Sequence, residues 1–157
     1  MQRCVFHTSQ LTTAVLISFC ISAAAQVEQK AAKDLLVGNW TLMIADNVGR
    51  DGNKVPGFGP LPKGTARFSA DGKYSLEVMP SVGDQPSIRA VGTYTLDDAG
   101  KALTFKVEES SVSAWKGTTQ NGTMKFVGSD HLGWTMSVPL VASGDVTGTE
   151  LIWARAK

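Results

Sequence analysis

Cysteine is scarce in this chain of 157 residues, and charge of either sign is nearly balanced. The two cysteines, Cys4 and Cys20, both lie close to the N-terminus, so no disulfide is expected to staple the rest of the chain. Fifteen basic residues against 14 acidic ones give a net charge of +1. This balance excludes a protein that binds nucleic acid through a clustered basic surface. The length is that of one domain.

Metal ligands and phosphate-binding loops are also missing. One histidine, His131, lies beyond the first 25 residues, and the acidic residues show no ligand spacing, so neither a metal site nor a cofactor is predicted. No glycine-rich loop leads from a strand into a helix, which argues against nucleotide binding. Ser129-Asp130-His131 contains the residue types of a catalytic triad, but consecutive residues point apart, and we interpret the segment as a turn.

The chain lacks a hydrophobic run of membrane-spanning length. Its longest apolar stretch, Leu11 to Ile21, has 11 residues, against the roughly 20 that a spanning helix needs. A basic residue precedes it, and Ala23 and Ala25 fit the small-x-small cleavage pattern, so residues 1–25 are predicted to be a secretory signal peptide. Removing 25 residues from 157 leaves a domain of 132 that begins at Gln26. We expect it to be exported, to the periplasm or the medium, with no membrane span after cleavage.

What the remaining chain has in abundance is alternation. Gln26 to Leu36 is the only helix-like stretch, with Val27, Ala31 and Leu35 on one stripe. After Gly38, period-2 runs alternate with Gly, Asp, Asn and Pro. Eight strands are predicted, over residues 39–46, 65–69, 73–79, 88–96, 102–109, 118–127, 132–138 and 149–155, with a long Gly/Pro loop over 47–64.

Many short strands joined by tight turns predict an antiparallel meander, in which a closed barrel and a two-sheet sandwich compete. Eight strands joined to their neighbours favour closure, because closure removes exposed edges. The inward positions are largely apolar and the opposite faces largely polar. They are predicted to be Trp40, Leu42, Ile44; Ala66, Phe68; Tyr74, Leu76, Val78; Ile88, Ala90, Gly92, Tyr94, Leu96; Leu103, Phe105, Val107; Met124, Phe126; Leu132, Trp134, Met136, Val138; Leu151, Trp153 and Arg155.

The sequence leaves several roles open. The small inward residues Ala66, Ala90 and Gly92 either leave room for a cavity or accommodate large rings. Phe58, in the loop, either covers the open end of the barrel or belongs to a segment that merely spans the gap. Glu109 shares parity with the inward residues of its strand, and either enters the barrel mouth or lies in water at the strand end. On the outer face of one hairpin, Arg67 and Glu77 are predicted to form an ion pair.

Several segments together resemble the bacterial lipocalin-like domain family. They are Leu36 to Leu42 with Gly38 and Trp40, Gly57 to Gly64, Phe68 to Ser75, Gly92 to Tyr94, Trp115 to Thr118, and Leu151 to Arg155. The resemblance covers nearly all of the mature chain and implies that Trp40 plugs one end of the barrel with Arg155 over its indole, a cation–π contact of about 0.5–2 kcal/mol. It departs from the family at Gly122, where relatives often carry an arginine, so it does not carry over an anionic-ligand site.

The sequence therefore predicts an eight-stranded antiparallel up-and-down β-barrel with a short N-terminal helix, binding a small hydrophobic molecule inside. One alternative is an enzyme, an isomerase, cyclase or hydrolase, which needs Glu109, His131 or a tyrosine in the cavity. The other is a packed structural or interaction module. Monomer and homodimer are both open. Seven aromatic residues are the candidates for ligand contact, with ordinary core packing as the alternative for each: Phe58, Phe68, Tyr74, Tyr94, Phe105, Trp115 and Trp134.

Overall fold

The structure is a computed structural model, and it describes residues 30–81, 86–137 and 145–157. The predicted signal peptide, Val27 of the helical stripe and Val138 of the predicted inward set lie outside the described residues. Among the helices of the described part, none is long and apolar enough to cross a membrane.

Strands make up most of the described chain, after a short helix over residues 30–36. A single-turn helix, η1 (Ser113–Trp115), interrupts their succession. The strands are β1 (Gly38–Gly49), β2 (Lys54–Pro56), β3 (Lys63–Phe68), β4 (Lys73–Met79), β5 (Ile88–Leu96), β6 (Ala102–Ser110), β7 (Thr119–Val127), β8 (His131–Met136) and β9 (Val146–Arg155).

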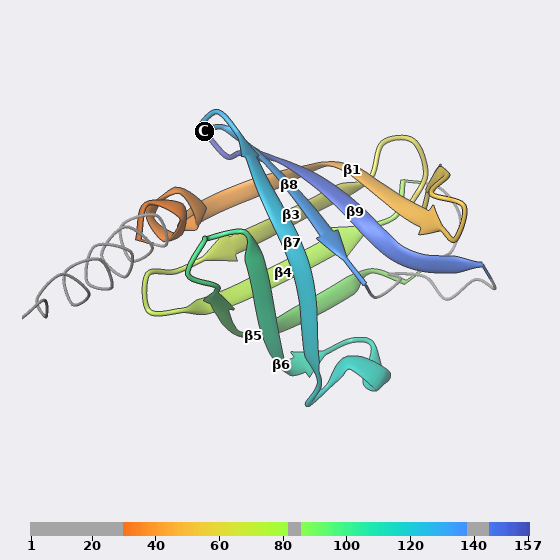
Figure 1. Ribbon diagram of the computed structural model, residues 1–157. Coiled ribbons are helices and arrows are strands. Elements are labelled where there is room, and N and C mark those ends of the chain that lie inside the picture. Colours follow the sequence, from red (N-terminus) through yellow and green to blue (C-terminus); the bar gives the residue numbers. More distant parts are fainter. Residues whose placement is uncertain (1–29, 82–85, 138–144) are drawn as a thin grey trace, which may run out of the picture.

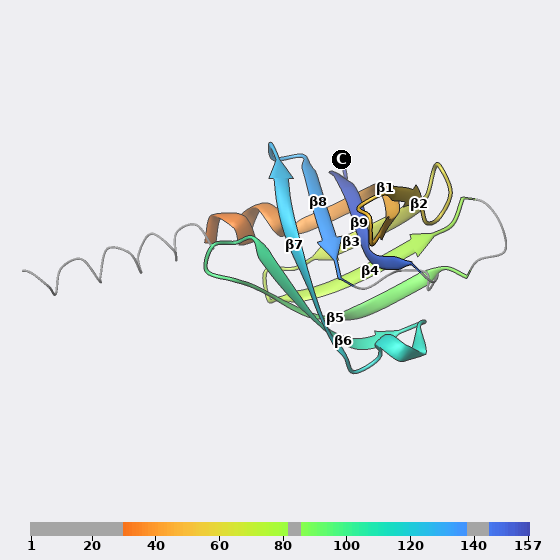
Figure 2. The same ribbon diagram turned by 45° about the vertical axis from the view of Figure 1, so that its right-hand side comes forward.

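The sheet closes on itself. Its order is β2-β1-β3-β4-β5-β6-β7-β8-β9, and β1 also pairs with β9, with every pairing antiparallel. β1 and β3–β9 therefore form the predicted eight-stranded barrel, and the sandwich is excluded (Figures 1 and 2). β2 was not predicted. It lies within the expected Gly/Pro loop and pairs with the second half of β1, which runs on to Gly49.

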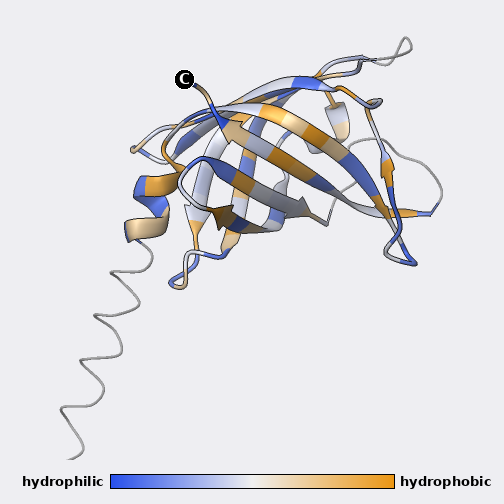
Figure 3. Cartoon of the chain, turned by 90° about the horizontal axis from the view of Figure 1, so that it is seen from above, coloured by the Kyte–Doolittle hydropathy of each residue, from blue (hydrophilic) through white to orange (hydrophobic). Residues whose placement is uncertain are grey.

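The barrel has two ends, and each strand runs from one end to the other. β1 starts beside the short helix, and β9 finishes there, with Trp40 paired to Arg155 (Figure 1). We call this the closed end. At the other end, β1 finishes beside the start of β9, with Val48 paired to Gly148. We call this the wide end. Hydrophobic and hydrophilic residues alternate along the strands, as Figure 3 shows, which is the pattern from which the inward faces were predicted.

One inward residue was predicted wrongly because β1 carries a bulge. Leu42 pairs with Trp153 and Ile44 with Ile152, so Met43 is an extra residue in the ladder. A bulge shifts the alternation by one position. As a result Ile44 is 43% exposed, and Ala45 takes its place in the core. The other described positions of the inward set are buried or half-buried.

The apolar stripe of the short helix was also placed one residue too early. Ala31 and Leu35 are exposed, whereas Leu36 is fully buried and Ala32 packs against the core. Because residues four apart share a helix face, Ala32 and Leu36 are an equally regular pair. The indole N–H of Trp40 donates to the carbonyl of Leu36, and this bond holds the stripe of Ala32 and Leu36 against the core.

Two tight turns connect neighbouring strands of the meander. Between β3 and β4, Gly72 has φ +84° and donates its N–H to the carbonyl of Ser69 at 3.0 Å. That left-handed conformation suits glycine. Between β5 and β6, the Asp97 carboxylate accepts hydrogen bonds from the N–H groups of Lys101 and Ala102, at 2.7 and 2.8 Å. Tight turns of this kind fix the register of the meander.

Candidate functional site: the barrel interior and its two ends

The closed end is a stopper built around Trp40. Its indole is fully buried, and its N–H donates to the carbonyl of Leu36 at 2.9 Å. The guanidinium of Arg155 lies 4.3 Å from the centre of the Trp40 ring, which confirms the predicted pair. The same guanidinium donates to the carbonyls of Leu35, Val37 and Ser129, at 2.5, 3.2 and 3.0 Å. It therefore ties the C-terminal end of the helix to the β7–β8 turn.

Glycine is required where the chain passes beneath this guanidinium. Gly38 has φ +139°, a conformation that side chains with a Cβ rarely adopt. A Cβ at this position would lie 2.8 Å from Nη1 of Arg155. Gly38, Trp40 and Arg155 thus form one contact unit. Gly38 leaves room for the Arg155 guanidinium, and that guanidinium covers the Trp40 ring.

Aromatic rings fill the middle of the barrel. Trp134 stacks on Phe105 with ring centres 4.5 Å apart and contacts Trp153 at 6.2 Å. Tyr74 meets Phe105 edge-on at 4.7 Å. Phe68 reaches across from β3 to the Trp134 ring on β8, at 6.1 Å. Such ring pairs contribute about 0.5–1.5 kcal/mol each beyond the area they bury. The interior is therefore an apolar, aromatic environment.

The wide end is covered by the segment that follows β2. Phe58 is 1% exposed and belongs to the hydrophobic core cluster. Its carbonyl accepts hydrogen bonds from the backbone N–H and the hydroxyl of Ser81, at 2.8 and 3.1 Å, and Gly57 donates to the carbonyl of Ala45 at 2.9 Å. The segment thus runs from β1 to the residues after β4 with its ring turned inward, which favours the covering role over a mere connection.

All seven aromatic candidates are buried, at both ends and between them. Phe68 and Tyr94 meet edge-on at 5.2 Å, and the Tyr94 hydroxyl donates to the carbonyl of Ser69 in the β3–β4 turn at 2.9 Å. Trp115, in η1, is 7% exposed. Burial, with the Glu108 carboxylate adding to it, raises the pKa of Tyr74 to about 12, so this phenol is neutral at physiological pH.

The small inward residue Gly92 does not create space for a ligand. A second bulge separates Val91, which pairs with Glu109, from Gly92, which pairs with Val107. A Cβ on Gly92 would lie 2.0 Å from the carbonyl oxygen of Lys106. The glycine therefore allows the β6 backbone to approach closely. Neither room for a cavity nor room for a large ring therefore explains why this position is glycine.

The same bulge turns Glu109 outward. This residue is exposed, and its carboxylate lies 2.7 Å from the ammonium of Lys116, so of its two alternatives the position in water at the strand end is confirmed. His131 is exposed as well. The Ser129 hydroxyl contacts the Asp130 carboxylate at 3.1 Å on the exposed surface, as expected for a turn. Glu109 and His131 therefore do not enter the interior, whereas Tyr74 and Tyr94, the tyrosines that the enzyme alternative also allowed, are buried there.

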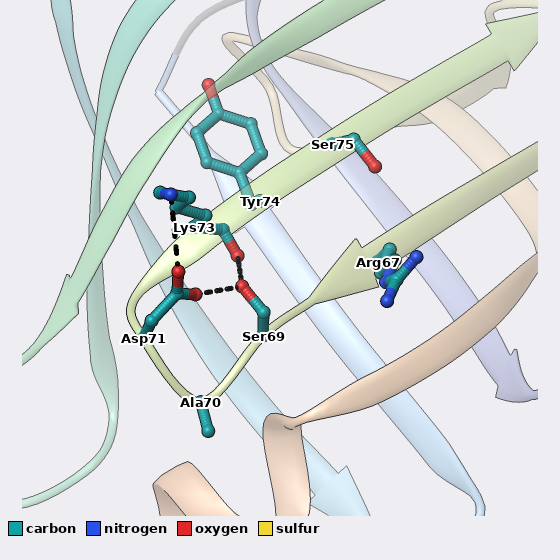
Figure 4. Close-up of a pocket in the computed structure, with 7 residues that line it drawn as sticks. All are labelled: Arg67, Ser69, Ala70, Asp71, Lys73, Tyr74 and Ser75. Atoms are coloured by element: carbon teal, nitrogen blue, oxygen red, sulfur yellow. Dashed lines mark hydrogen bonds and ion pairs between the residues drawn. The ribbon is translucent and has the colours of Figure 1, made fainter.

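The part of the chain that the structure describes contains no group of three or more His, Cys, Asp or Glu side chains able to hold a metal ion. On the outside, a shallow depression of about 440 Å³ lies at the β3–β4 hairpin, lined by Arg67, Ser69, Asp71 and Lys73 among others (Figure 4). The predicted pair of Arg67 with Glu77 does not form. Glu77 instead bonds Arg89 directly across the ladder, at 2.7 Å.

Sequence reasoning missed the buried polar residues of the interior, which are Asn47, Gln120 and Thr149. Asn47 was assigned to the loop, because the bulge at Met43 was not foreseen. Counted from Ala45, it falls on the inward face. Gln120 shares parity with Met124 on β7, so the alternation already contained this signal. Thr149 pairs with Asn47 at the wide end.

No protein-family model and no curated protein sequence matches this chain. Among solved structures, a redesigned β-barrel has a TM-score of 0.48 and 12% identity, covering 80% of this chain and 96% of its own. A de novo designed fluorescence-activating β-barrel has a TM-score of 0.45 and 15% identity, covering 80% and 97%. A third, EF1p2_mFAP2b bound to DFHBI, has a TM-score of 0.49 and 14% identity, covering 82% and 99%. At such scores the similarity carries no information on function.

Proposed function

We propose that this protein is an exported, lipocalin-like carrier that holds a small hydrophobic molecule inside its barrel. The observation that carries the proposal is the difference between the two ends. The closed end is sealed by Trp40, Arg155 and the helix through five contacts of the chain with itself. The wide end is covered by the Phe58 ring on a surface segment. A molecule would enter at the wide end and rest against the aromatic rings.

The lipocalin-like assignment rests on the closed end. A glycine, a buried tryptophan and a final arginine over its indole are the features that the sequence resemblance singled out, and here they form one contact unit. Without a matching family model, membership of that family is part of the proposal.

The central test is whether the purified protein carries or takes up an apolar molecule. Native mass spectrometry of protein from its own host should show an added mass that disappears on denaturation, and solvent extraction should release a species of the same mass. Uptake is then measured with naphthalene derivatives by calorimetry. A folded protein that carries no added mass and binds no apolar probe would overturn the proposal.

Export is tested separately. N-terminal sequencing of the protein recovered from the periplasm or the medium should begin at Gln26, because cleavage is expected after Ala25. Recovery only from the cytoplasm, with residues 1–25 still attached, would remove export from the proposal and leave ligand binding untouched.

A packed module is the second candidate, and the ring cluster favours it. Contacts among Phe68, Tyr74, Phe105, Trp134 and Trp153 occupy the middle of the barrel. Both candidates fit a stable barrel. They differ in what the wide half of the interior admits, and binding of apolar probes decides between them.

A further inference from the structure

Three buried polar atoms of the interior have no hydrogen-bond partner in the described part of the chain. They are Nε1 of Trp134, Nε1 of Trp153 and Oδ1 of Asn47. These residues are 1%, 0% and 7% exposed, so surface water does not satisfy them. More than nine in ten buried polar groups in native proteins are bonded, and each one left unpaired costs about 1–3 kcal/mol. Three in one barrel indicate that the interior is arranged for a group that supplies the missing partners.

The backbones of the three residues lie at successive levels of the barrel, counted along β9. Asn47 pairs with Thr149, Trp134 pairs with Leu151, and Trp153 lies one level deeper. Each level is two residues along a strand, or about 7 Å. The Trp134 indole reaches back toward the level of Asn47, because its N–H lies against Gly122, which pairs with Met136.

The acceptor and one donor each lie against a glycine. A Cβ on Gly57 would be 3.0 Å from Oδ1 of Asn47, and a Cβ on Gly122 would be 3.1 Å from Nε1 of Trp134. At both places a side chain would crowd the polar atom, so glycine allows the polar group to lie directly against the backbone. Gly122 is also the position at which the resemblance departs from an arginine.

The missing partner is uncharged. The buried polar and charged residues of the described chain are Asn47, Gln120 and Thr149, and none of them carries a charge. A carboxylate or phosphate held in this interior would stand without a counter-charge, which is strongly unfavourable. The hydrogen bonds on offer are those that neutral oxygen atoms make.

We propose, resting on the proposed carrier function, that the barrel selects a neutral, largely apolar molecule with a carbonyl-type acceptor at its inner end and a hydroxyl donor at its outer end. The carbonyl accepts from the indole N–H of Trp134. The hydroxyl donates to Oδ1 of Asn47. The aromatic rings between these groups supply the apolar contact.

Three probes with one skeleton test this selectivity on the purified protein by calorimetry. 6-Hydroxy-2-acetylnaphthalene carries both groups, 2-ethylnaphthalene carries neither, and 6-hydroxy-2-naphthoate replaces the ketone by a carboxylate. The hydroxyketone is expected to bind at least about tenfold more tightly than the hydrocarbon, because leaving a buried donor unpaired is unfavourable. The carboxylate is expected to bind more weakly than the hydroxyketone.

Trp134→Phe removes the donor and keeps a ring. It is expected to reduce the preference for the hydroxyketone severalfold, because only the contact of the hydroxyl with Asn47 remains, and to leave hydrocarbon binding within about threefold. Phe126→Leu is the control, because Phe126 packs against the core beside Trp40 and carries no hydrogen-bonding group, and it should keep the preference. Hydrocarbon binding reports whether each variant is folded.

The outcomes separate the two proposals. If the hydrocarbon and the hydroxyketone bind the unmodified protein equally well, the carrier function stands and the selectivity inference is overturned. An undiminished preference in Trp134→Phe overturns the role of its N–H. If the folded protein binds none of the three probes, both proposals fail, and the polar atoms are simply unpaired.

Discussion

Buried tryptophans differ in their hydrogen bonding between the closed end and the interior of the barrel. At the closed end, the N–H of the buried Trp40 is bonded to a carbonyl and its ring is covered by the Arg155 guanidinium. In the interior, the equally buried Trp134 and Trp153 have rings in contact with other rings and N–H groups without a partner among the described residues. The polar atoms of the closed end are therefore bonded within the chain, whereas those of the two interior tryptophans are not bonded by the part that the structure describes. This contrast separates a structural tryptophan from one available to a ligand.

The largest effect is expected from breaking the closed end with Trp40→Phe, compared with Trp134→Phe. Both substitutions shrink a buried ring, but only the first also removes a formed hydrogen bond and a cation–π contact. Trp40→Phe should therefore lower the free energy of unfolding by about 1–3 kcal/mol more than Trp134→Phe does. Urea denaturation followed by circular dichroism measures both. Equal losses would contradict the distinction between the two tryptophans.

A smaller effect on stability is expected from a substitution at Gly38, which tests how closely Arg155 packs against the chain. Gly38→Ala places a methyl against Nη1 of Arg155 and forces a backbone conformation that costs about 1–3 kcal/mol for a residue with a Cβ. Gly128→Ala is the control, because Gly128 also has a positive φ but nothing lies near its Cβ position. Thermal unfolding should show the larger loss for Gly38→Ala. A larger loss for the control would refute the packing argument.

The two tyrosines extend the comparison to hydroxyl groups. Tyr94→Phe removes a hydrogen bond to the Ser69 carbonyl and should destabilise the protein by about 0.5–1.5 kcal/mol near neutral pH. The structure gives the Tyr74 hydroxyl no hydrogen bond to a described residue, so Tyr74→Phe should cost less. Denaturant unfolding of both variants at pH 7 tests this order, and a reversed order would contradict it.

The ionisation of Tyr74 should make the free energy of unfolding depend on pH in the alkaline range. Its pKa is raised from 10.0 to about 12, so between these values the unfolded state has lost a proton that the folded state still holds. Stability therefore falls as pH rises from about 10 to about 12, and Tyr74→Phe should make that fall shallower. Unfolding free energies measured across this range test it. An unchanged slope would mean that Tyr74 ionises normally.

The smallest effect on stability is expected at the wide end. Ser81→Ala removes a hydroxyl that donates to the Phe58 carbonyl at 3.1 Å and accepts from the N–H of Leu61 at 3.3 Å. The free energy of unfolding should fall by less than about 1 kcal/mol. Stopped-flow measurement should show a bound naphthalene probe leaving severalfold faster. Ser111→Ala is the control, since its hydroxyl bonds Arg89 on β5, and its rate should match wild type.

Alternation was enough to predict most of the fold. β4 and β5 were predicted to the residue. The closed end with Gly38, Trp40 and Arg155 was implied by the resemblance to the lipocalin-like family, and the contact of Arg155 with Trp40 confirms that pair. The error at Ile44 has a simple cause. It follows a bulge that adds one residue to β1, and parity counted through a bulge assigns the wrong face. The bulge in β6 likewise makes parity uninformative at Glu109, whose position the sequence left open. The bulges themselves have no periodic signature, because they depend on which backbone lies opposite.

The sequence by itself determined an antiparallel barrel of eight strands and an aromatic interior, because period 2, turn glycines and residue size act locally along the chain. The tryptophan stopper was implied by the resemblance alone. Only the tertiary structure decided which buried polar atoms find partners. The N–H of Trp40 meets a carbonyl because the helix ends beside it, and those of Trp134 and Trp153 meet none within the described chain. A hydrogen bond depends on what lies opposite in space, and spacing along the chain does not encode that.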